Sequence, residues 1–236
     1  MREIDFLKVV SDEPDRCAYL PRQTARLPLQ VPAAGLTAAQ FDQLLAAGYR
    51  RSGWFFYKPQ CPACRACEPL RIEVDNFCPS RSQRRAKKRG VQHLRVQFAP
   101  PIIDARRLEI FNAHRLQRQL AEDQECVDEQ DYRSFLVHSY ADVRELSLWV
   151  DERLVAVSIT DVGACSLSAV YCFFDPQYAW LSPGTYAILQ QIDLARAWGY
   201  RWLYLGLMVA DNPHLKYKAN FRPHQRRLDG VWQTFD

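Results

Sequence analysis

The sequence lacks several features that would assign it to a common class at once. It has only 9 glycines in 236 residues, and it contains neither a glycine-rich dinucleotide fingerprint nor a P-loop. No run approaches the roughly 20 apolar residues that a membrane-spanning helix needs, and the start of the chain lacks the apolar core of a signal peptide. These absences argue against a nucleotide-binding doubly wound sheet and a membrane protein, and they predict a cytoplasmic location.

The composition that remains is that of an ordinary globular protein. The chain is 48% hydrophobic and 25% charged, which excludes a disordered chain and a fibrous repeat. Its length suits one compact unit or two intimately packed halves. The net charge of +4 is too small to establish nucleic-acid binding by itself, so the distribution of charge has to be examined.

Prolines divide the chain into two unlike parts. Eight prolines from Pro14 to Pro79 interrupt the first part, so residues 1–99 are predicted to be a loop-rich, cysteine-containing region. Pro100 and Pro101 mark the boundary of a second domain over residues 100–236. The elements predicted in the first region are a helix that Thr37 caps and Gly48 ends, and an aromatic strand over Tyr49–Lys58.

The second region has a clearer order of elements. Apolar spacing and turn residues predict helices, then a meander of three strands, then a helix capped by Ser182, a strand, a helix and a strand. This order indicates an α+β fold with a mixed sheet. The predicted bounds are Asp104–Ala121, Asp128–Tyr140, Arg144–Val150, Leu154–Asp161, Ser166–Phe174, Pro183–Trp198 and Trp202–Leu207.

Three cysteines lie at intervals of three. Cys61, Cys64 and Cys67 have a spacing that lets thiolates converge on one ion, and Cys17 or Cys78 is available as a fourth ligand. Four thiolates suit zinc and an iron–sulfur cluster equally well. The alternative is a proline-bounded loop of reduced cysteines without a metal.

A basic run follows the cysteines. Six basic residues and no acid lie between Arg81 and Arg89, and Arg81, Ser82, Arg84 and Arg85 offer donors that suit phosphate oxygens. The alternative is a solvated basic helix without a ligand.

The aromatic strand before the cysteines brings arginines beside rings. Arg50, Arg51, Ser52 and Tyr57 belong to it, and aromatic rings can stack on unpaired bases such as those at the end of a tRNA. The alternative is an ordinary strand with its rings in the core.

Short motifs in a fixed order span roughly residues 17–232. In the first half they are Cys17-Ala-Tyr-Leu-Pro, Gly48-Tyr-Arg-Arg-Ser-Gly53, Cys61-Pro-Ala-Cys-Arg-Ala-Cys67, Pro69-Leu-Arg71 and Ser80-Arg-Ser-Gln-Arg-Arg85. In the second half they include Ile159-Thr-Asp161, Leu167-Ser-Ala-Val-Tyr171, Tyr204-Leu-Gly206, Tyr217-Lys-Ala219 and Phe221-Arg-Pro223. Together they resemble the bacterial aspartate/glutamate leucyltransferases of the N-degron pathway, relatives of the eukaryotic arginyltransferases.

This resemblance implies a fold and an activity. It implies a second half like the GCN5-related N-acyltransferases that uses an aminoacyl ester of tRNA in place of acyl-CoA. The implied partners are leucyl-tRNA, proteins with N-terminal Asp or Glu, which the added leucine marks for degradation, and a downstream protease adaptor. Transfer from an activated ester needs no further cofactor.

The resemblance also suggests roles for individual residues. Arg50, Arg51, Arg84 and Arg85 are expected to hold the tRNA end or the acidic side chain of the acceptor, and Arg222 joins this substrate-binding set. Tyr171, Tyr217 and Lys218 are expected to line the reaction cleft. Ser168 or Tyr171 is a candidate proton relay, and Lys218 is a candidate ligand for the acceptor carboxylate or for the developing oxyanion.

Two stretches depart from the family pattern, and alternatives stay open. The family motifs are replaced here by Gly206-Leu207-Met208-Val209 and Asn212-Pro213-His214-Leu215. The amino acid donated by the tRNA is therefore either leucine or arginine. Rival readings of another class are a non-catalytic, metal-containing tRNA-binding module and an acyltransferase that uses acyl-CoA.

Overall fold

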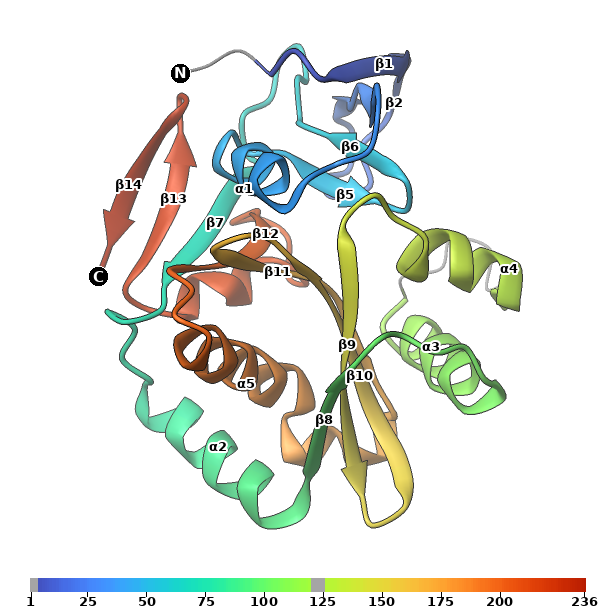
Figure 1. Ribbon diagram of the computed structural model, residues 1–236, viewed down its shortest axis with the longest axis vertical. Coiled ribbons are helices and arrows are strands. Elements are labelled where there is room, and N and C mark those ends of the chain that lie inside the picture. Colours follow the sequence, from blue (N-terminus) through green and yellow to red (C-terminus); the bar gives the residue numbers. More distant parts are fainter. Residues whose placement is uncertain (1–3, 120–125) are drawn as a thin grey trace.

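The centre of the molecule is an eight-stranded mixed sheet. A computed structural model describes residues 4–119 and 126–236, and Figure 1 shows the sheet with helices on both faces. The strand order is β14-β13-β7-β12-β11-β10-β9-β8, and every neighbouring pair is antiparallel except β11 and β12. The bounds are β7 Glu68–Glu73, β8 Arg95–Ala99, β9 Asp142–Val150, β10 Arg153–Val162, β11 Ser166–Phe174, β12 Trp202–Met208, β13 His224–Leu228 and β14 Val231–Phe235.

The predicted meander of three strands is confirmed. β9, β10 and β11 pair antiparallel in chain order, and β11 has the predicted bounds. Their side chains fill two buried layers, because Val155 and Ala156 contact one hydrophobic cluster while Leu154 and Val157 contact another. The register shift between Leu154 and Ala156 lets two successive residues face the same layer. Burial on both faces explains why these strands read as nearly continuous apolar runs.

Helices cover the two faces of this sheet. α5 (Pro183–Ala197) packs on one face and α3 (Ala105–Gln117) on the other, and α2 (Arg81–His93) packs against α5 (Figure 1). Asp104 caps α3, and residues 120 and 121 of the longer predicted helix lie outside the described part of the chain. Among the described residues, no helix has the length and apolarity that a membrane crossing requires.

Three details of the helix prediction were wrong. The expected helix over Asp128–Tyr140 is a single turn, α4 (Glu129–Tyr132), that continues as a π-helical turn, η1 (Arg133–Val137). Ser182 does not cap α5 with its side chain, because its φ of 56° is left-handed, and its Oγ instead accepts a hydrogen bond from Arg89. The last predicted helix is a 3₁₀ turn, η3 (Lys216–Asn220), followed by two strands instead of one.

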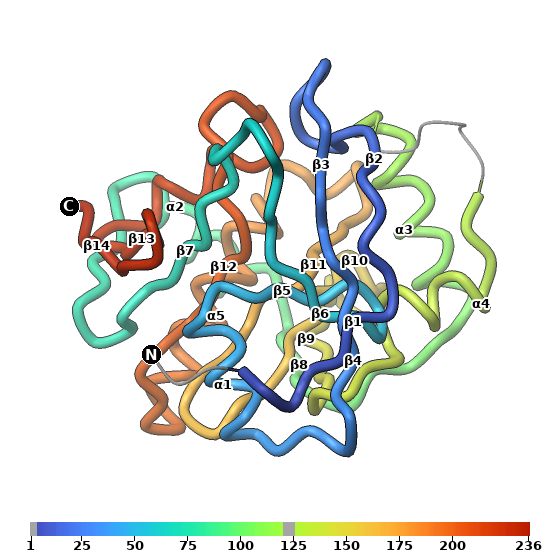
Figure 2. The backbone as a smooth tube through the Cα atoms, turned by 90° about the horizontal axis from the view of Figure 1, so that it is seen from above, coloured from blue at the N-terminus to red at the C-terminus, as the bar shows by residue number. Residues whose placement is uncertain are grey.

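The N-terminal region builds a second, smaller sheet in the order β1-β4-β6-β5. It lies above the main sheet in Figure 1 and in front of it in Figure 2, which is seen from above. Its helix α1 (Ala38–Ala46) has the predicted N-cap, Thr37. The predicted aromatic strand is instead a hairpin, because Gly53 adopts a φ of 56° and turns the chain between β5 and β6. The bounds in this region are β1 Leu7–Ser11, β2 Pro14–Arg16, β3 Thr24–Arg26, β4 Leu29–Pro32, β5 Arg50–Ser52 and β6 Phe55–Tyr57.

The two halves of the chain share the main sheet. β7 and β8 come from the first half, and β7 lies between β12 and β13 of the second. A hydrophobic cluster also joins Phe41 and Leu44 of α1 to Tyr204 of β12. The N-terminal hairpin is therefore held against the centre of the main sheet, which positions the site described next.

Candidate functional site

The candidate site lies at the point where β11 and β12 stop pairing, which is called the split below. These parallel strands are paired over Ser166–Ser168 and Trp202–Tyr204 only, although both continue beyond these residues. The register of β11 against β10 shifts at the same level, between Ala169 and Tyr171. Bulges and diverging strands leave backbone groups without ladder partners, so side chains or a ligand can reach them.

β12 has a matching irregularity. Its register against β7 shifts between Tyr204 and Gly206, and Gly206 has a φ of 86°. A methyl group on Gly206 would lie 2.9 Å from Nη2 of Arg50 and 3.2 Å from Nζ of Lys218. Glycine thus allows two cationic side chains to lie directly against the backbone of β12.

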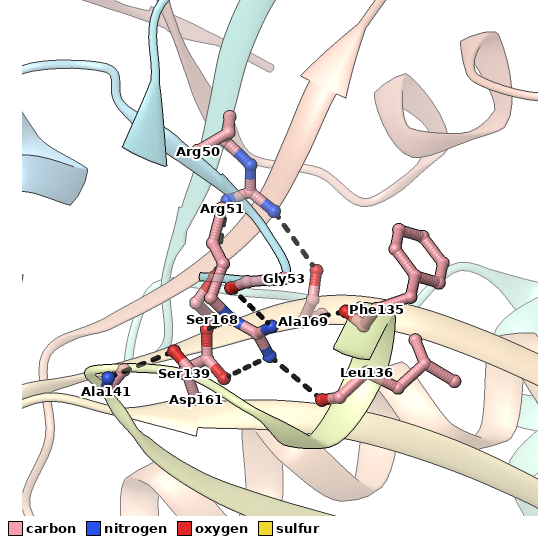
Figure 3. A network of polar contacts seen from close by, with 10 residues as sticks. All are labelled: Arg50, Arg51, Gly53, Phe135, Leu136, Ser139, Ala141, Asp161, Ser168 and Ala169. Atoms are coloured by element: carbon pink, nitrogen blue, oxygen red, sulfur yellow. Dashed lines mark hydrogen bonds and ion pairs between the residues drawn. The ribbon is translucent and has the colours of Figure 1, made fainter. Parts of the chain in front are cut away.

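Arg50 reaches this point from the β5–β6 hairpin. Its guanidinium donates to Oγ of Ser168 and to the carbonyl oxygen of Ala169, both at 3.3 Å (Figure 3). The side chain is buried, and burial lowers the pKa of Arg50 even though Tyr57 and Asp161 act in the opposite direction. Tyr57 lies directly across the hairpin from Arg50, so the pairing register fixes both residues together.

Lys218 reaches the same point from η3. Its Nζ donates to the carbonyl oxygen of Leu207 at 2.8 Å. Burial, followed by repulsion from Arg50, lowers the pKa of Lys218 to about 7. Because β11 and β12 have diverged, Arg50 satisfies a carbonyl of one strand and Lys218 a carbonyl of the other.

Arg51 points to a different place from its neighbour Arg50. It forms a bidentate ion pair with Asp161 at 2.7 and 2.8 Å, with 2% and 0% of the two side chains exposed. It also donates to backbone carbonyls of Gly53 and Leu136, which Figure 3 shows around its guanidinium. Arg51 therefore ties the hairpin to β10 and η1 and is not placed in the split between β11 and β12.

Tyr171 and Tyr217 lie near the same two residues, Cys172 and Arg118. Burial raises the pKa of Tyr217 to about 12 and also raises that of Tyr171, and both hydroxyls are influenced by Cys172 and Arg118. The ring of Tyr171 packs edge-on against Phe111 and Phe135. Ser168 is 2% exposed and accepts from Arg50, so its placement suits positioning that arginine.

A loop connection that the sequence did not reveal also borders the site. Asn212 donates to the carbonyl oxygen of Tyr19 at 2.9 Å and accepts from the backbone amide of His214, whose Nδ1 lies 3.0 Å from Nη2 of Arg118. Burial, followed by Tyr57, raises the pKa of Tyr19. Tyr19 lay within a family motif, and Asn212 and His214 lay in a stretch that departs from the family pattern, but no spacing rule could have brought these residues together.

The four predicted cysteines lie close to one another. Burial raises the pKa of Cys67 to about 12, and Cys61, Cys17 and Cys64 each add to the rise, so all three thiols lie near it. Within residues 4–119 and 126–236, however, no three His, Cys, Asp or Glu side chains form a group that could hold a metal ion. The metal ion expected from the spacing of these cysteines therefore stays a prediction, and no step of the reaction is derived through one.

The basic run forms the exposed face of α2. Ser80 and Gln83 form a capping box at its start, and Nε2 of Gln83 donates to the carbonyl oxygen of Asn220, which fixes α2 to η3. Ala86 and Gly90 face the core. The predicted residues Arg81, Ser82, Arg84 and Arg85 are exposed, as are Lys88 and Arg222.

An open cavity lies elsewhere in the molecule. It is bordered by the β9–β10 turn, the start of α3 and Tyr178, and none of the predicted site residues lines it. The arginines on its wall are engaged, because Arg106 and Arg153 both bind Asp175 and Arg107 binds Glu145. Its polar groups therefore serve the fold.

Two family models cover both halves of the chain and give its class, a tRNA-dependent protein transferase. The model for the C terminus of arginine-tRNA-protein transferases matches residues 106–228, and the model for their N terminus matches residues 15–85. The chain belongs to the arginine-tRNA-protein transferase family.

Curated relatives match along nearly the whole chain. The aspartate/glutamate leucyltransferase of Aeromonas hydrophila is 35% identical over 237 residues, which cover 100% of this chain and 98% of that protein. The leucyltransferase of the same name from Chromobacterium violaceum is 35% identical over 221 residues, covering 94% and 91%. The aspartate/glutamate leucyltransferase of Halorhodospira halophila is 36% identical over 211 residues, which cover 89% of this chain and 89% of that protein.

Similar solved structures are more distant. FemX superposes with a TM-score of 0.47 at 8% identity, covering 85% of this chain and 81% of that one. The L-PGS structure from Bacillus licheniformis gives a TM-score of 0.48 at 13% identity, covering 72% and 59%. The α+β assignment rests on the mixed sheet of this chain itself.

Proposed function

We propose that this chain transfers leucine from leucyl-tRNA to the N-terminal Asp or Glu of a protein. The α-amine of the acceptor attacks the carbonyl carbon of the leucyl ester and forms a peptide bond. The ester bond to the ribose oxygen of the tRNA breaks, and that oxygen takes up the proton that the amine gives away. An α-amine has a pKa near 8, so a useful fraction is neutral at pH 7 and no nucleophile from the protein is required.

One observation carries this proposal. The buried Arg50 and the half-buried Lys218 lie together at the point where the parallel strands diverge. Tyr171, Tyr217 and Ser168 are proposed to line the same place, which gives it positive charge and hydroxyl groups. An acidic acceptor and an ester that develops negative charge both suit these groups. The relatives that match the whole chain carry the name of this activity.

The donor is tested by direct transfer. Purified protein is incubated with labelled leucyl-tRNA or arginyl-tRNA and with peptides that begin with Asp, Glu or Ala. Leucine is expected on the Asp and Glu peptides alone. Transfer of arginine in its place would support the second candidate, which the family name suggests, and transfer of neither would contradict the assignment.

The amino acid on the donor tRNA is proposed not to contact Leu207, Met208 and Val209, the stretch that departs from the family pattern. Leu207, Met208 and Val209 are at most 4% exposed, and Met208 packs in the hydrophobic core beneath the sheet. These side chains therefore stabilise β12. The leucine of the donor is proposed to lie on the side of the split that faces the tyrosines.

The exposed face of α2 is proposed to bind the phosphates of the tRNA. Among the described residues, Arg81, Arg84, Arg85 and Lys88 form no ion pair with an acid. They recur at helical spacing on one face, so they form a single positive stripe. A hollow beside Arg84 and Lys88 interrupts this face. Asn220, the last residue of η3, accepts a hydrogen bond from Gln83 near the start of the stripe, so η3 with Lys218 lies next to it.

Removing charge from this stripe is expected to weaken tRNA binding without slowing transfer. The double substitution Arg85→Gln/Lys88→Gln should raise the KM for leucyl-tRNA roughly tenfold near 0.1 M salt and leave kcat unchanged. Losing two phosphate contacts should also lower the slope of log KM against log salt concentration by about two. Steady-state kinetics at several salt concentrations measure both quantities.

A matched control removes the same charge elsewhere. Lys8→Gln/Arg144→Gln changes one residue on β1 and one on β9 and should leave both the KM and its salt dependence as in the wild type. Equal effects of the two double substitutions would show that only the net charge matters and that α2 is not the binding face.

Further parts of the proposal follow from the family. A cytoplasmic location and a downstream protease adaptor are proposed with this activity. The four cysteines Cys17, Cys61, Cys64 and Cys67 stay a proposed zinc or iron–sulfur group, to be tested by metal analysis of the purified protein. Transfer itself is proposed to need no cofactor.

A further inference from the structure

The cations at the split have no acidic partner in the described part of the chain. Arg50 is hydrogen-bonded only to a hydroxyl and a carbonyl, and Lys218 only to a carbonyl. Asp161 favours the charged form of Arg50 from a distance, but both of its oxygens already bind Arg51. A buried charge is normally paired, so two unpaired cations side by side indicate a site for an anion that is not part of the protein.

The geometry of the pair specifies the kind of anion. The guanidinium of Arg50 presents two donors in a plane, and Lys218 adds a point charge, which together suit the two oxygens of a carboxylate. Arg50 is 8% exposed, whereas a phosphodiester between two sugars requires an open surface. A carboxylate at the end of a short side chain is narrow enough to enter.

We infer that Arg50 and Lys218, lying over Gly206, bind the side-chain carboxylate of the acceptor's first residue. This inference rests on the proposed transfer to acidic N-termini and adds which residues recognise them. Lys218 is half-buried, so the pair can be reached from outside. Gly206 is part of the site, because any side chain there would occupy the space between the two cations and the strand.

The test compares matched peptides. Peptides that differ only in an N-terminal Asp or Asn are titrated into the full-length protein without tRNA, and their dissociation constants are measured by calorimetry. The wild type should prefer the Asp peptide about 10- to 100-fold. Lys218→Met should remove most of that preference, because methionine is an unbranched side chain of nearly the same length that carries no charge.

Controls separate recognition from folding. Lys216→Met changes an exposed lysine two positions away in η3 and should keep the full preference. If circular dichroism shows that Lys218→Met is misfolded, Lys218→Arg is tested in its place. It keeps the positive charge and should therefore retain the preference for the Asp peptide. An unchanged ratio in Lys218→Met, or an equal affinity of the wild type for both peptides, would overturn the inference.

The pH dependence provides a second readout. Lys218 in the free protein is charged below its pKa of about 7 and neutral above it, whereas the acceptor carboxylate is ionised throughout. Arg50 from β5 is the charged group that acts on Lys218, and β12 faces it with the Leu207 carbonyl. The Asp-over-Asn preference should therefore be greatest near pH 6 and fall above pH 7, by up to about tenfold per pH unit.

Two results distinguish this inference from its alternatives. A preference that is independent of pH in the wild type would contradict the role of Lys218. If Lys218→Met leaves the peptide ratio unchanged but weakens the binding of uncharged tRNA, the pair binds a phosphate and the inference is wrong. Peptide binding is measured without leucyl-tRNA, so failure of the proposed transfer would show in the labelling assay and not here.

Discussion

Replacing Asp161 with asparagine is expected to lower the free energy of unfolding by roughly 3–5 kcal/mol. The reason is that Arg51 and Asp161 are 2% and 0% exposed, so the substitution leaves a buried guanidinium without its counter-charge. The carbonyl oxygens of Gly53 and Leu136 that remain around Arg51 carry only partial charge. Urea unfolding monitored by circular dichroism measures the change as a shift of the midpoint.

An exposed ion pair supplies the comparison for this experiment. Arg133 and Glu129 lie 2.7 Å apart with 44% and 64% of their side chains exposed. Glu129→Gln is expected to change stability by no more than about 0.5 kcal/mol. If Asp161→Asn proved no more harmful than this control, the backbone carbonyls would be sufficient to hold Arg51, and the ion pair would not be the main connection between the hairpin and β10.

Adding a single methyl group at Gly206 is expected to reduce transfer on the order of 100-fold. The new Cβ would lie 2.9 Å from Nη2 and 3.2 Å from Cζ of Arg50, and 3.2 Å from Nζ of Lys218, so both cations must move. Displacement of about 1 Å at a reacting centre is enough for such a loss. The φ of 86° adds strain of roughly 1–3 kcal/mol. Values of kcat/KM with an Asp peptide measure the effect.

A second glycine shows whether the effect is local. Gly35 has no atom within 4 Å of the position of an added Cβ and lies in an exposed loop. Gly35→Ala should therefore keep wild-type transfer and stability. If Gly206→Ala transferred leucine as fast as Gly35→Ala, the cations would not need to lie against β12, and the site would have to be placed elsewhere.

Several local elements were predictable from the sequence because their signals are contained within them. Thr37 and Asp104 cap helices with oxygens close in sequence to the amides that they bind. The meander β9–β11 follows from strand-forming runs separated by turn residues. The hairpin of β5 and β6 was missed, because aromatic residues on both sides of Gly53 favour a strand while the left-handed φ of that glycine breaks it.

What the sequence alone determined is the family, the α+β class and most of the second half, since motif order and apolar periodicity report which face of an element is buried. Only the tertiary structure decided that β7 enters the main sheet beside β12 and that β11 and β12 diverge. It also decided that the adjacent residues Arg50 and Arg51 bind different groups. Alternation along β5 directs Arg50 to the split and Arg51 to Asp161, and pairing between strands distant in sequence determines what each one meets.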